Sequence, residues 1–346
     1  MALVISVALV PLGVAPLAAG VLLRRVATTH VLRGASAVLA VSVGLTALRL
    51  PFALLLATRL VQGTAIAALL TALMTHIARM QQGAQMQRLM AAYVAATILG
   101  GFLGRFVAGG TASVASDVHF FVGLAALLAL SDLGLRRLAV VPPSQTTARS
   151  SRMRLGSILT RGPVVRIYVL VFGLFFVFSA FMNFLPFRLR GVHPGASEAL
   201  TGGLYVGYLV GVAASLGAQR IAAVLSGPRT AMGVGSGGIL GALALATYPS
   251  VPMLFGAVAV LCGAFFLAHA VAAGRVNEVG DRPGEGPRDG SGRGLVNGLY
   301  VAVYYTGGVL GAYLPGFVYD AYGWDAFLLL LAGMTVAAGS ALFVRR

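Results

Sequence analysis

The sequence predicts an all-α membrane protein built from two repeated bundles of transmembrane helices. Of its 346 residues, 58% are hydrophobic and only 10% are charged, and the mean hydropathy is +0.91, whereas soluble domains carry about 25% charged residues. Eleven apolar segments follow one another along the chain, and the later ones repeat residue patterns of the earlier ones. This composition excludes a cytosolic enzyme, a secreted disulfide scaffold and a nucleic-acid-binding module.

Each apolar segment is close to the length of about 20 residues that a helix needs to cross the hydrocarbon core. The predicted helices cover residues 3–23, 33–50, 52–78, 89–110, 118–138, 166–188, 202–223, 231–249, 251–274, 295–318 and 326–344. Two polar stretches interrupt them, at 142–163 and at 275–293, and both are interpreted as solvated loops. The single Cys262 lies in an apolar run, so the sequence predicts no disulfide.

The basic residues predict the orientation of the helices. All 25 of them are Arg. If residues 139–165 are cytoplasmic, 20 of the 25 Arg residues fall on that same side, and only Arg49, Arg188 and Arg190 fall on the other. Cytoplasmic loops of membrane proteins carry such an excess. We therefore expect the C-terminus inside and, with eleven helices, the N-terminus outside; the net charge of +16 reports orientation rather than nucleic-acid binding.

An internal repeat divides the chain into two halves. Shifting the sequence by 207 residues aligns two Tyr-Val-Ala triplets and a set of glycines: Tyr93-Val94-Ala95 with Tyr300-Val301-Ala302, and Gly100, Gly101, Gly104 and Gly109 with Gly307, Gly308, Gly311 and Gly316. We predict a five-helix bundle at 1–138, a cytoplasmic linker at 139–165 and a six-helix bundle at 166–346. The partner of helix 166–188 would precede residue 1, so the first helix of six is missing: the true start lies upstream, or the protein is truncated.

Several motifs carry a family resemblance. Arg59-Leu-Val-Gln62-Gly63 matches an R-x-x-Q-G signature, Gly100 to Gly110 form a glycine-rich helix containing Arg105, and Tyr304-Tyr305-x-Gly307-Gly308 follows later. Together they resemble the major facilitator superfamily, in particular its arabinose-efflux/acriflavine-sensitivity branch of exporters. The resemblance implies two bundles that rock around a site at the middle of the membrane.

The substrate and coupling candidates are polar or aromatic residues within predicted helices: Arg59, Gln62, Asn183, His269, Tyr300 and Tyr304. An Arg or His inside a membrane is costly and indicates a functional site. The alternatives stay open: Arg59 snorkels to the interface, Gln62 and Asn183 make helix-packing hydrogen bonds, and His269 is a satisfied buried side chain. The tyrosines and neighbouring aromatics would line a cavity for an apolar or cationic ligand.

A second group of candidates is expected to act in gating and helix packing: Gly100, Gly104, Arg105, Gly109, Gly307 and Gly311. Glycines at such spacing allow helices to approach closely. The resemblance places Gly20, Arg24 and Arg25 in the cytoplasmic loop that follows the family's second helix. There the family carries an Asp that latches the outward-facing state, whereas this chain has Arg24.

None of the nine carboxylates is central in a predicted helix. Proton coupling would therefore run through His269 with Arg59, or through an acid on the missing helix, or the transporter is not coupled to protons. We expect proton-coupled efflux of a small organic molecule (drug, sugar or metabolite) by a monomer in the bacterial inner (plasma) membrane, without enzymatic activity, catalytic residues, metal, cofactor or nucleic-acid partner. The alternatives are an uptake transporter or uniporter, and a non-transporting remnant.

Overall fold

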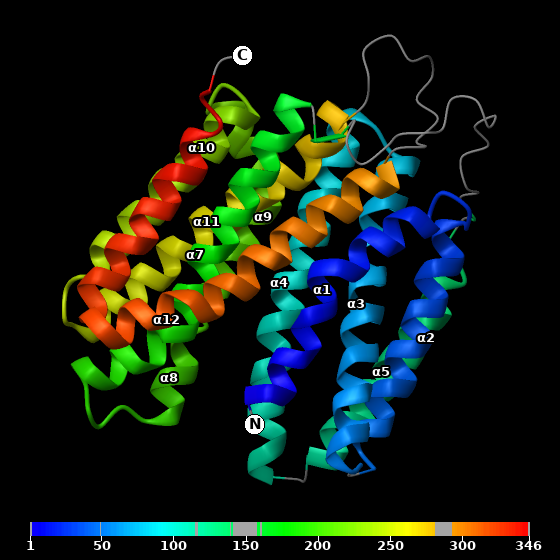
Figure 1. Cartoon of the computed structure of the whole chain (residues 1–346), viewed down its shortest axis with the longest axis horizontal. Coiled ribbons are helices and arrows are strands. Elements are labelled where there is room, and N and C mark those ends of the chain that lie inside the picture. The colour runs from blue at the N-terminus through cyan, green and yellow to red at the C-terminus, as the bar shows by residue number, and fades with distance from the viewer. Residues whose placement is uncertain are drawn as a thin grey trace. The chain divides into compact units, whose positions relative to one another are not determined.

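The computed structural model describes residues 2–48, 50–114, 117–138, 140, 158–159, 161–280 and 293–344. All regular structure in these residues is helical, as Figure 1 shows. The helices are α1 (Ala2–Leu22), α2 (Thr28–Thr46), α3 (Phe52–Met80), α4 (Gly83–Val114), α5 (Asp117–Leu135), α7 (Gly162–Val192), α8 (Glu198–Leu204), α9 (Gly207–Val224), α10 (Pro228–Leu245), α11 (Val251–Gly280) and α12 (Arg293–Ser340).

The predicted apolar segments all fall on these helices, and the all-α membrane architecture is confirmed. Eight helices of the described part are long and apolar enough to cross a membrane. Two predicted segments are joined in α12, where Gly323 interrupts the helical backbone at φ 78°, ψ −170°. The segment expected at 202–223 is divided into α8 and α9.

Several helix boundaries differ from the expected ones, and two of the differences concern the polar stretches. The expectation that a solvated loop begins at residue 275 is wrong for its first residues. There α11 continues to Gly280, and Asn277 is buried. The amide side chain there is sheltered by neighbouring helices, which hydropathy alone does not report. Likewise α7 begins at Gly162, inside the expected linker. Residues 141–157 and 281–292 lie outside the described part of the chain.

Local sequence signals explain where several helices begin. Ser197 precedes α8 and its hydroxyl accepts a hydrogen bond from the amide of Leu200 at 3.1 Å, as an N-cap serine does. Pro228 opens α10 directly after Gly227, whose φ of 123° suits glycine. Pro51 stands immediately before α3. Proline at a helix start costs no hydrogen bond, since the first amides have no partner within the helix.

The chain forms two compact units, and the first comprises Met1–Gln82, Gly104–Arg161 and Asn277–Tyr305. Within it α3 is the central helix, because both α1 and α2 pack against it, and α2 also packs along α5 (Figure 1). Leu39 and Val43 of α2 meet Ala65 of α3 in one buried cluster, and partly buried residues of α5 cover it. Small side chains on α3 thus let its neighbours approach closely.

The second unit comprises Gly83–Leu103, Gly162–Val276 and Thr306–Arg346, and its core is aromatic. The ring of Phe178 on α7 stacks on Phe265 of α11 with centroids 4.3 Å apart. Phe181 of α7 lies against Trp324, and the Trp324 indole donates a hydrogen bond to the Ala246 carbonyl at 2.9 Å. Offset and edge-to-face ring pairs of this kind add to the burial of apolar area. The aromatic face of α7 therefore organises this unit.

The two units do not coincide with the two sequence halves. The beginning of α4, a first-half helix, belongs to the second unit, and the beginning of α12, a second-half helix, belongs to the first. The 207-residue repeat relates α4 to α12. Each of these two equivalent helices therefore begins in the unit that contains most of the other half. The bundle boundaries at 138 and 166 remain predictions of the repeat.

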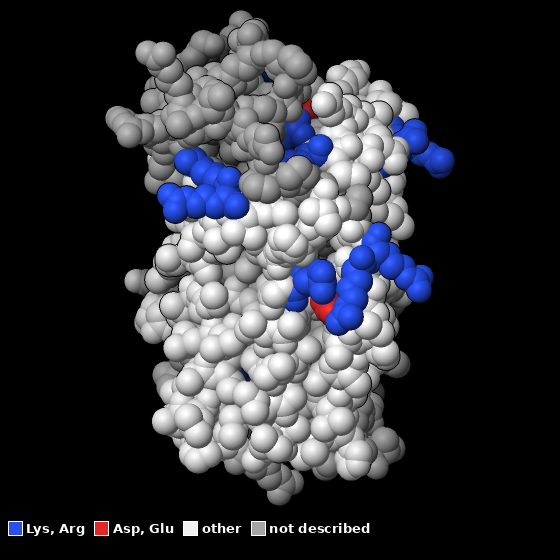
Figure 2. Space-filling model, turned by 90° about the vertical axis from the view of Figure 1, so that its right-hand side faces the viewer, with Lys and Arg blue, Asp and Glu red and all other residues white. Residues whose placement is uncertain are grey.

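Charged residues are few in the sequence, and one face of the molecule reflects this. Figure 2 shows a face that is mostly uncharged, with more Arg than carboxylate among its charged residues. This agrees with a composition of 25 Arg against nine Asp and Glu. An apolar surface of this extent suits a protein whose solvent is largely lipid.

Candidate functional site

Arg59 and Gln62 form a bonded pair on α3. The Arg59 guanidinium donates from Nη1 to Oε1 of Gln62 at 2.9 Å, and it lies 5.7 Å from the centre of the Phe121 ring on α5. Gln62 is buried and donates from Nε2 to the Ser42 carbonyl on α2 at 2.9 Å. Both ends of the Gln62 amide are therefore used. The pair holds the Arg59 charge between α2, α3 and α5. Of the two roles considered for Gln62, substrate binding and an interhelical hydrogen bond, the structure shows the hydrogen bond.

An apolar groove of about 430 Å³ lies beside this pair, between α2 and α3. The hydroxyls of its two polar lining residues, Ser42 and Thr58, donate to carbonyls of their own helices, at 3.0 and 2.7 Å. Val41 and Leu54, which also line it, are largely exposed. The groove thus presents apolar surface and few polar groups that would fix the orientation of a polar ligand.

His269 is buried on α11, in the second unit. It is 7% exposed, and its ring lies parallel to that of Phe265, with an interplanar angle of 3° and centroids 5.9 Å apart. Phe265 in turn stacks on Phe178 of α7. The imidazole is therefore the polar end of the aromatic core, at a position from which water is largely excluded.

Asn183 lies on α7 and is exposed, but its amide is engaged. Nδ2 donates to the Ala312 carbonyl of α12 at 2.9 Å. Its neighbours Phe181 and Phe184 pack into the aromatic core, against Trp324 and Phe327. Asn183 consequently ties α7 to α12, and its exposed position also leaves it open to a ligand.

Tyr300 and Tyr304 form a stacked pair at the start of α12, in the first unit. Their ring centroids are 6.4 Å apart with an interplanar angle of 6°, and Tyr305 meets Tyr304 edge-on at 5.1 Å. Tyr300 is 1% exposed. The structure therefore brings together two candidate pairs, Arg59 with Gln62 and Tyr300 with Tyr304, and it places His269 and Asn183 in the other unit.

Gly20 marks a close approach between a first-half and a second-half helix. A Cβ atom on Gly20 of α1 would collide with the carbonyl of Gly294 at the start of α12, and one on Gly298 would collide with the carbonyl of Pro16. Both contacts lie within the first unit. Arg24 is partly buried in the turn that follows α1, and Arg25 is exposed. Small residues here let the two backbones touch.

Buried and partly buried polar groups surround this contact, and no motif in the sequence predicts that they lie together. The Asn297 amide of α12 donates to the Thr75 hydroxyl of α3 at 3.2 Å. One turn along α3, Arg79 donates to the Leu23 carbonyl at 2.8 Å. His76 shares a hydrogen bond of 2.8 Å with Thr28. In the sequence, these residues can be recognised only as polar side chains near the Arg-rich ends of apolar helices. Which of them pair with one another depends on the tertiary structure.

A matching contact lies in the second unit, between α4 and α9. The Gln219 amide of α9 donates to the Gln87 side chain of α4 at 2.9 Å, and the Ser215 hydroxyl donates to the Ala91 carbonyl at 2.9 Å. Gln87 also contacts Gly274 of α11. Gln87 and Ser215 are both buried. Here again a first-half helix binds second-half helices.

The repeat relates these two contacts to each other. Gly294 and Gly298 of α12 are 207 residues after Gln87 and Ala91 of α4. Their respective partners, α1 and α9, align at an offset of 198, which places Gly13-Val14-Ala15 on Gly211-Val212-Ala213. Both contacts also lie beside Arg residues that the sequence assigns to the cytoplasmic side. Equivalent helices thus pair twice: α1 of the first half with α12 of the second, and α9 of the second half with α4 of the first.

The glycines expected to act in gating and helix packing differ in their surroundings between the halves. A Cβ on Gly307 or Gly311 of α12 would collide with a carbonyl oxygen of α7, of Phe172 or Phe176 respectively. Around Gly100 and Gly104 of α4, by contrast, the described structure has no atom within 4 Å of such a Cβ. Arg105 and Gly109 lie within α4, but their surroundings are outside the described part of the chain.

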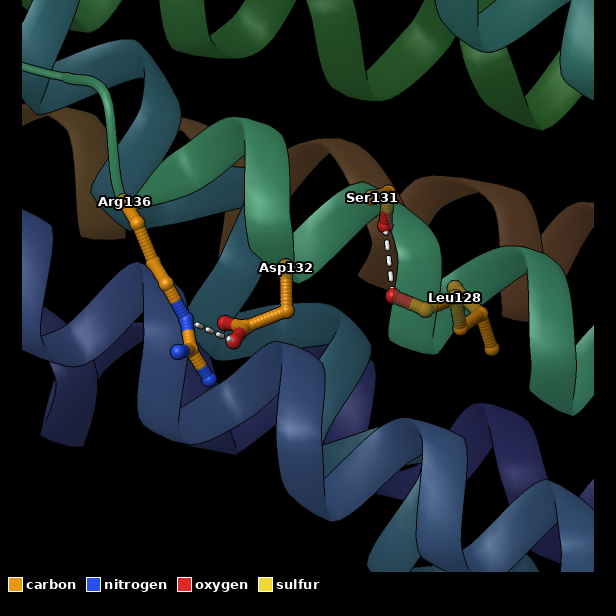
Figure 3. A network of polar contacts seen from close by, with 4 residues as sticks. All are labelled: Leu128, Ser131, Asp132 and Arg136. Atoms are coloured by element: carbon orange, nitrogen blue, oxygen red, sulfur yellow. Dashed lines mark hydrogen bonds and ion pairs between the residues drawn. The ribbon is translucent and has the colours of Figure 1, made fainter.

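The carboxylates within the described helices lie near helix ends. Asp132, close to the end of α5, forms an ion pair of 3.4 Å with Arg136, while the Ser131 hydroxyl bonds to the Leu128 carbonyl (Figure 3). Glu278 lies at the end of α11, and Asp320 and Asp325 flank the break at Gly323. In the described part of the chain, the ionisable side chains deep in the spans are therefore Arg and His rather than Asp or Glu.

Comparison with known proteins gives a consistent result. The family model described as Major Facilitator Superfamily matches residues 1–276. No curated protein sequence matches the chain. Among solved structures, the human organic anion transporter MFSD10 (TETRAN) is similar with a TM-score of 0.83 and 19% identity, over 98% of this chain and 83% of that one. A Major Facilitator Superfamily transporter, FucP, in the outward conformation, gives a TM-score of 0.73 and 13% identity over 99% and 89%.

Proposed function

The chain belongs to the Major Facilitator Superfamily and is a multi-pass membrane protein of the secondary-transporter class, and we propose that it exports a small organic molecule in exchange for protons by alternating access. Its membership of the arabinose-efflux/acriflavine-sensitivity branch rests on the motifs around Arg59, Gly104 and Tyr304. The bacterial inner membrane is the proposed location, with the C-terminus inside.

The observation that carries the proposal is the pair of contacts between sequence halves. In one unit α1 and α3 meet the start of α12, and in the other the start of α4 meets α9 and α11. Both contacts lie beside Arg residues that the sequence places inside. Together they would close the cytoplasmic side in one state and separate in the other, as alternating access requires.

His269 is the proposed proton-binding group. Histidine is the side chain that exchanges a proton near neutral pH, and ionisable residues inside a membrane mark ion pathways. His269 is buried at the edge of the aromatic core, where protonation would place a charge against Phe265. Arg59 supplies a fixed positive charge within a span, and its guanidinium is held by Gln62.

The test is a flux screen in proteoliposomes with and without an imposed pH gradient. Three probes represent the substrate classes: a cationic dye, a fluorescent organic anion and a radiolabelled sugar. The organic anion is included because MFSD10 is described as an organic anion transporter. We expect one class to move against its gradient when protons move down theirs, and the Arg59→Gln variant to move it more slowly.

Two results would contradict parts of the proposal separately. Flux that is saturable but indifferent to the pH gradient would remove proton coupling and leave a uniporter. Absence of saturable flux for all three classes, in vesicles where the protein is shown to be folded and inserted, would favour the non-transporting remnant.

A further inference from the structure

Two arginines of the first unit, Arg79 and Arg293, lie close together where α1 and α3 end and α12 begins. Arg79, in the last turn of α3, donates from Nη2 to the Leu23 carbonyl, just beyond the end of α1, at 2.8 Å. Arg293 is the first residue of α12 and is 5% exposed. A Cβ on Gly294, the next residue, would lie 3.3 Å from the Leu23 Cβ. Leu23 therefore contacts both Arg79 and the first turn of α12.

The Arg79 guanidinium uses only part of its capacity for hydrogen bonds. A guanidinium group has five N–H donors. Nε and Nη1 of Arg79 are buried and lack a hydrogen-bond partner among the described residues. Donors left unpaired in this way are costly, above all on a charged group, and call for an explanation such as a bound ion. Nε and Nη1 are therefore candidate donors to an acceptor from outside the chain.

The charge next to Arg79 has the same sign as its own. Arg293 acts on Arg79 electrostatically, and Arg79 acts in the same way on His76, one turn earlier on α3. In the described part of the chain, the charge that acts most strongly on Arg79 is thus another cation and not a carboxylate. Two like charges that are partly withdrawn from water repel each other strongly. An anion between them would offset this repulsion and accept hydrogen bonds from Nε and Nη1 of Arg79.

We propose that Arg79 and Arg293 together bind an oxyanion of the phosphate class at the meeting point of α1, α3 and α12. Arginine suits this ligand, because its planar guanidinium stays charged and offers several donors in fixed directions. Both side chains are long enough to turn toward an anion that enters from the helix ends. The sequence assigns these ends to the cytoplasmic side, where inorganic phosphate and the phosphate groups of anionic lipids are both present. Binding of this anion requires no transport, so it can be tested independently of proton-coupled export.

The first test measures binding of inorganic phosphate to the purified 346-residue chain in a nonionic detergent. Radiolabelled phosphate is expected to bind saturably. It should also raise the thermal midpoint by several degrees over chloride at the same ionic strength, because a ligand that binds only the folded state stabilises that state. Phosphate also stabilises proteins generally, since it is excluded from their surfaces. The contribution of the site is therefore the difference between the wild type and variants that lack the site.

Arg79→Gln and Arg293→Gln are these variants, and each is expected to weaken phosphate binding about ten-fold or more, the value of one hydrogen bond to a charged group. Arg33→Gln is the matched control, because Arg33 is exposed on α2, near the helix end that the sequence assigns to the same side. It should bind phosphate as the wild type does. Thermal unfolding in chloride shows whether each variant is folded, and Arg293→Gln carries the test if Arg79→Gln is not.

A second experiment distinguishes a free anion from a lipid headgroup. The chain is placed in nanodiscs of phosphatidylcholine alone or of phosphatidylcholine mixed with phosphatidylglycerol. If the phosphate of an anionic lipid is the occupant, phosphatidylglycerol should raise the midpoint of the wild type but not of Arg79→Gln, and it should compete with inorganic phosphate. If a free anion is the occupant, inorganic phosphate should bind equally well in both membranes. Either result supports the oxyanion site.

Three results would overturn the proposal. Neither inorganic phosphate nor phosphatidylglycerol could stabilise the wild type more than it stabilises Arg79→Gln. Arg33→Gln could weaken binding as much as Arg79→Gln does, which would reduce the effect to a general attraction of anions to the Arg-rich side. Phosphate could bind only after Glu278 and the carboxylates within residues 281–289 have been replaced by amides, which would show that the chain's own carboxylates serve the two arginines.

Discussion

The Gln62 side chain joins two roles that a sequence motif cannot separate. It accepts from Arg59 and donates to the backbone of α2, so it both orients a charge and holds two helices together. Replacing a packing residue lowers the stability of the transporter even without substrate. Replacing a residue that only binds substrate lowers the affinity for substrate and leaves that stability unchanged.

Replacing Gln62 by Leu is expected to destabilise the protein. The variant removes the bond to the Ser42 carbonyl and the acceptor of Arg59, and an interhelical hydrogen bond in a membrane contributes about 0.6 kcal/mol on average, up to about 2 kcal/mol. Thermal unfolding in detergent measures the loss. Thr64→Ala is the control, since its exposed hydroxyl bonds only to Leu60 of the same helix. An unchanged midpoint with a raised KM would instead assign Gln62 to substrate binding.

Replacing His269 by Gln is expected to uncouple transport from protons. Gln preserves polarity but carries no exchangeable charge, so flux driven by a pH gradient should be lost while counterflow of substrate without a gradient continues. Both are measured in the same proteoliposomes. His193→Gln is the control, because His193 is exposed in the connection after α7. Flux by H269Q that still responds to the gradient would exclude His269 as the proton carrier.

At the level of helices, hydropathy predicted where the spans lie but not how they continue. The segments at 295–318 and 326–344 were expected as separate helices, and the non-helical backbone at Gly323 does separate two helices within the range of α12. The extension of α11 through Asn277 could not be predicted from hydropathy because a polar residue there is buried by neighbours. The pairings Gln62–Ser42 and Asn297–Thr75 join residues 20 and 222 positions apart, so they required the fold. The repeat, by contrast, anticipated the equivalence of α4 and α12.

The break in α12 depends on glycine. Gly323 has φ 78°, ψ −170°, a region that side chains with a Cβ rarely adopt and that costs roughly 1–3 kcal/mol. Gly323→Ala is therefore expected to lower the free energy of unfolding by about that amount, measured by denaturant or thermal unfolding. Gly333→Ala, on the same helix with open space around its Cβ, should be neutral or stabilising by about 0.5–1 kcal/mol. Equal effects of the two variants would show that the break carries no strain.

For the whole molecule, the proposed cycle depends on first-half helices binding second-half helices and releasing them. The bonds Gln87–Gln219 and Asn297–Thr75 are neutral hydrogen bonds at close helix contacts. A neutral hydrogen bond contributes only about 1 kcal/mol, so these contacts would form and break at small cost.

The most direct measurement is flux through a transporter whose α4–α9 contact has been locked. Gln87→Cys and Gln219→Cys, in a Cys262→Ala background, are bridged in proteoliposomes by a short bis-methanethiosulfonate reagent, which spans the distance between two long side chains that meet at their ends. Flux is assayed with whichever substrate class the flux screen identifies. Ser236→Cys with Gly339→Cys, treated with the same reagent, is the control, because it joins α10 to α12 within the second half of the sequence. We expect bridging to stop flux through the first pair, reduction to restore it, and the control pair to transport in both states. Undiminished flux through the bridged Gln87–Gln219 pair would contradict alternating closure at this contact.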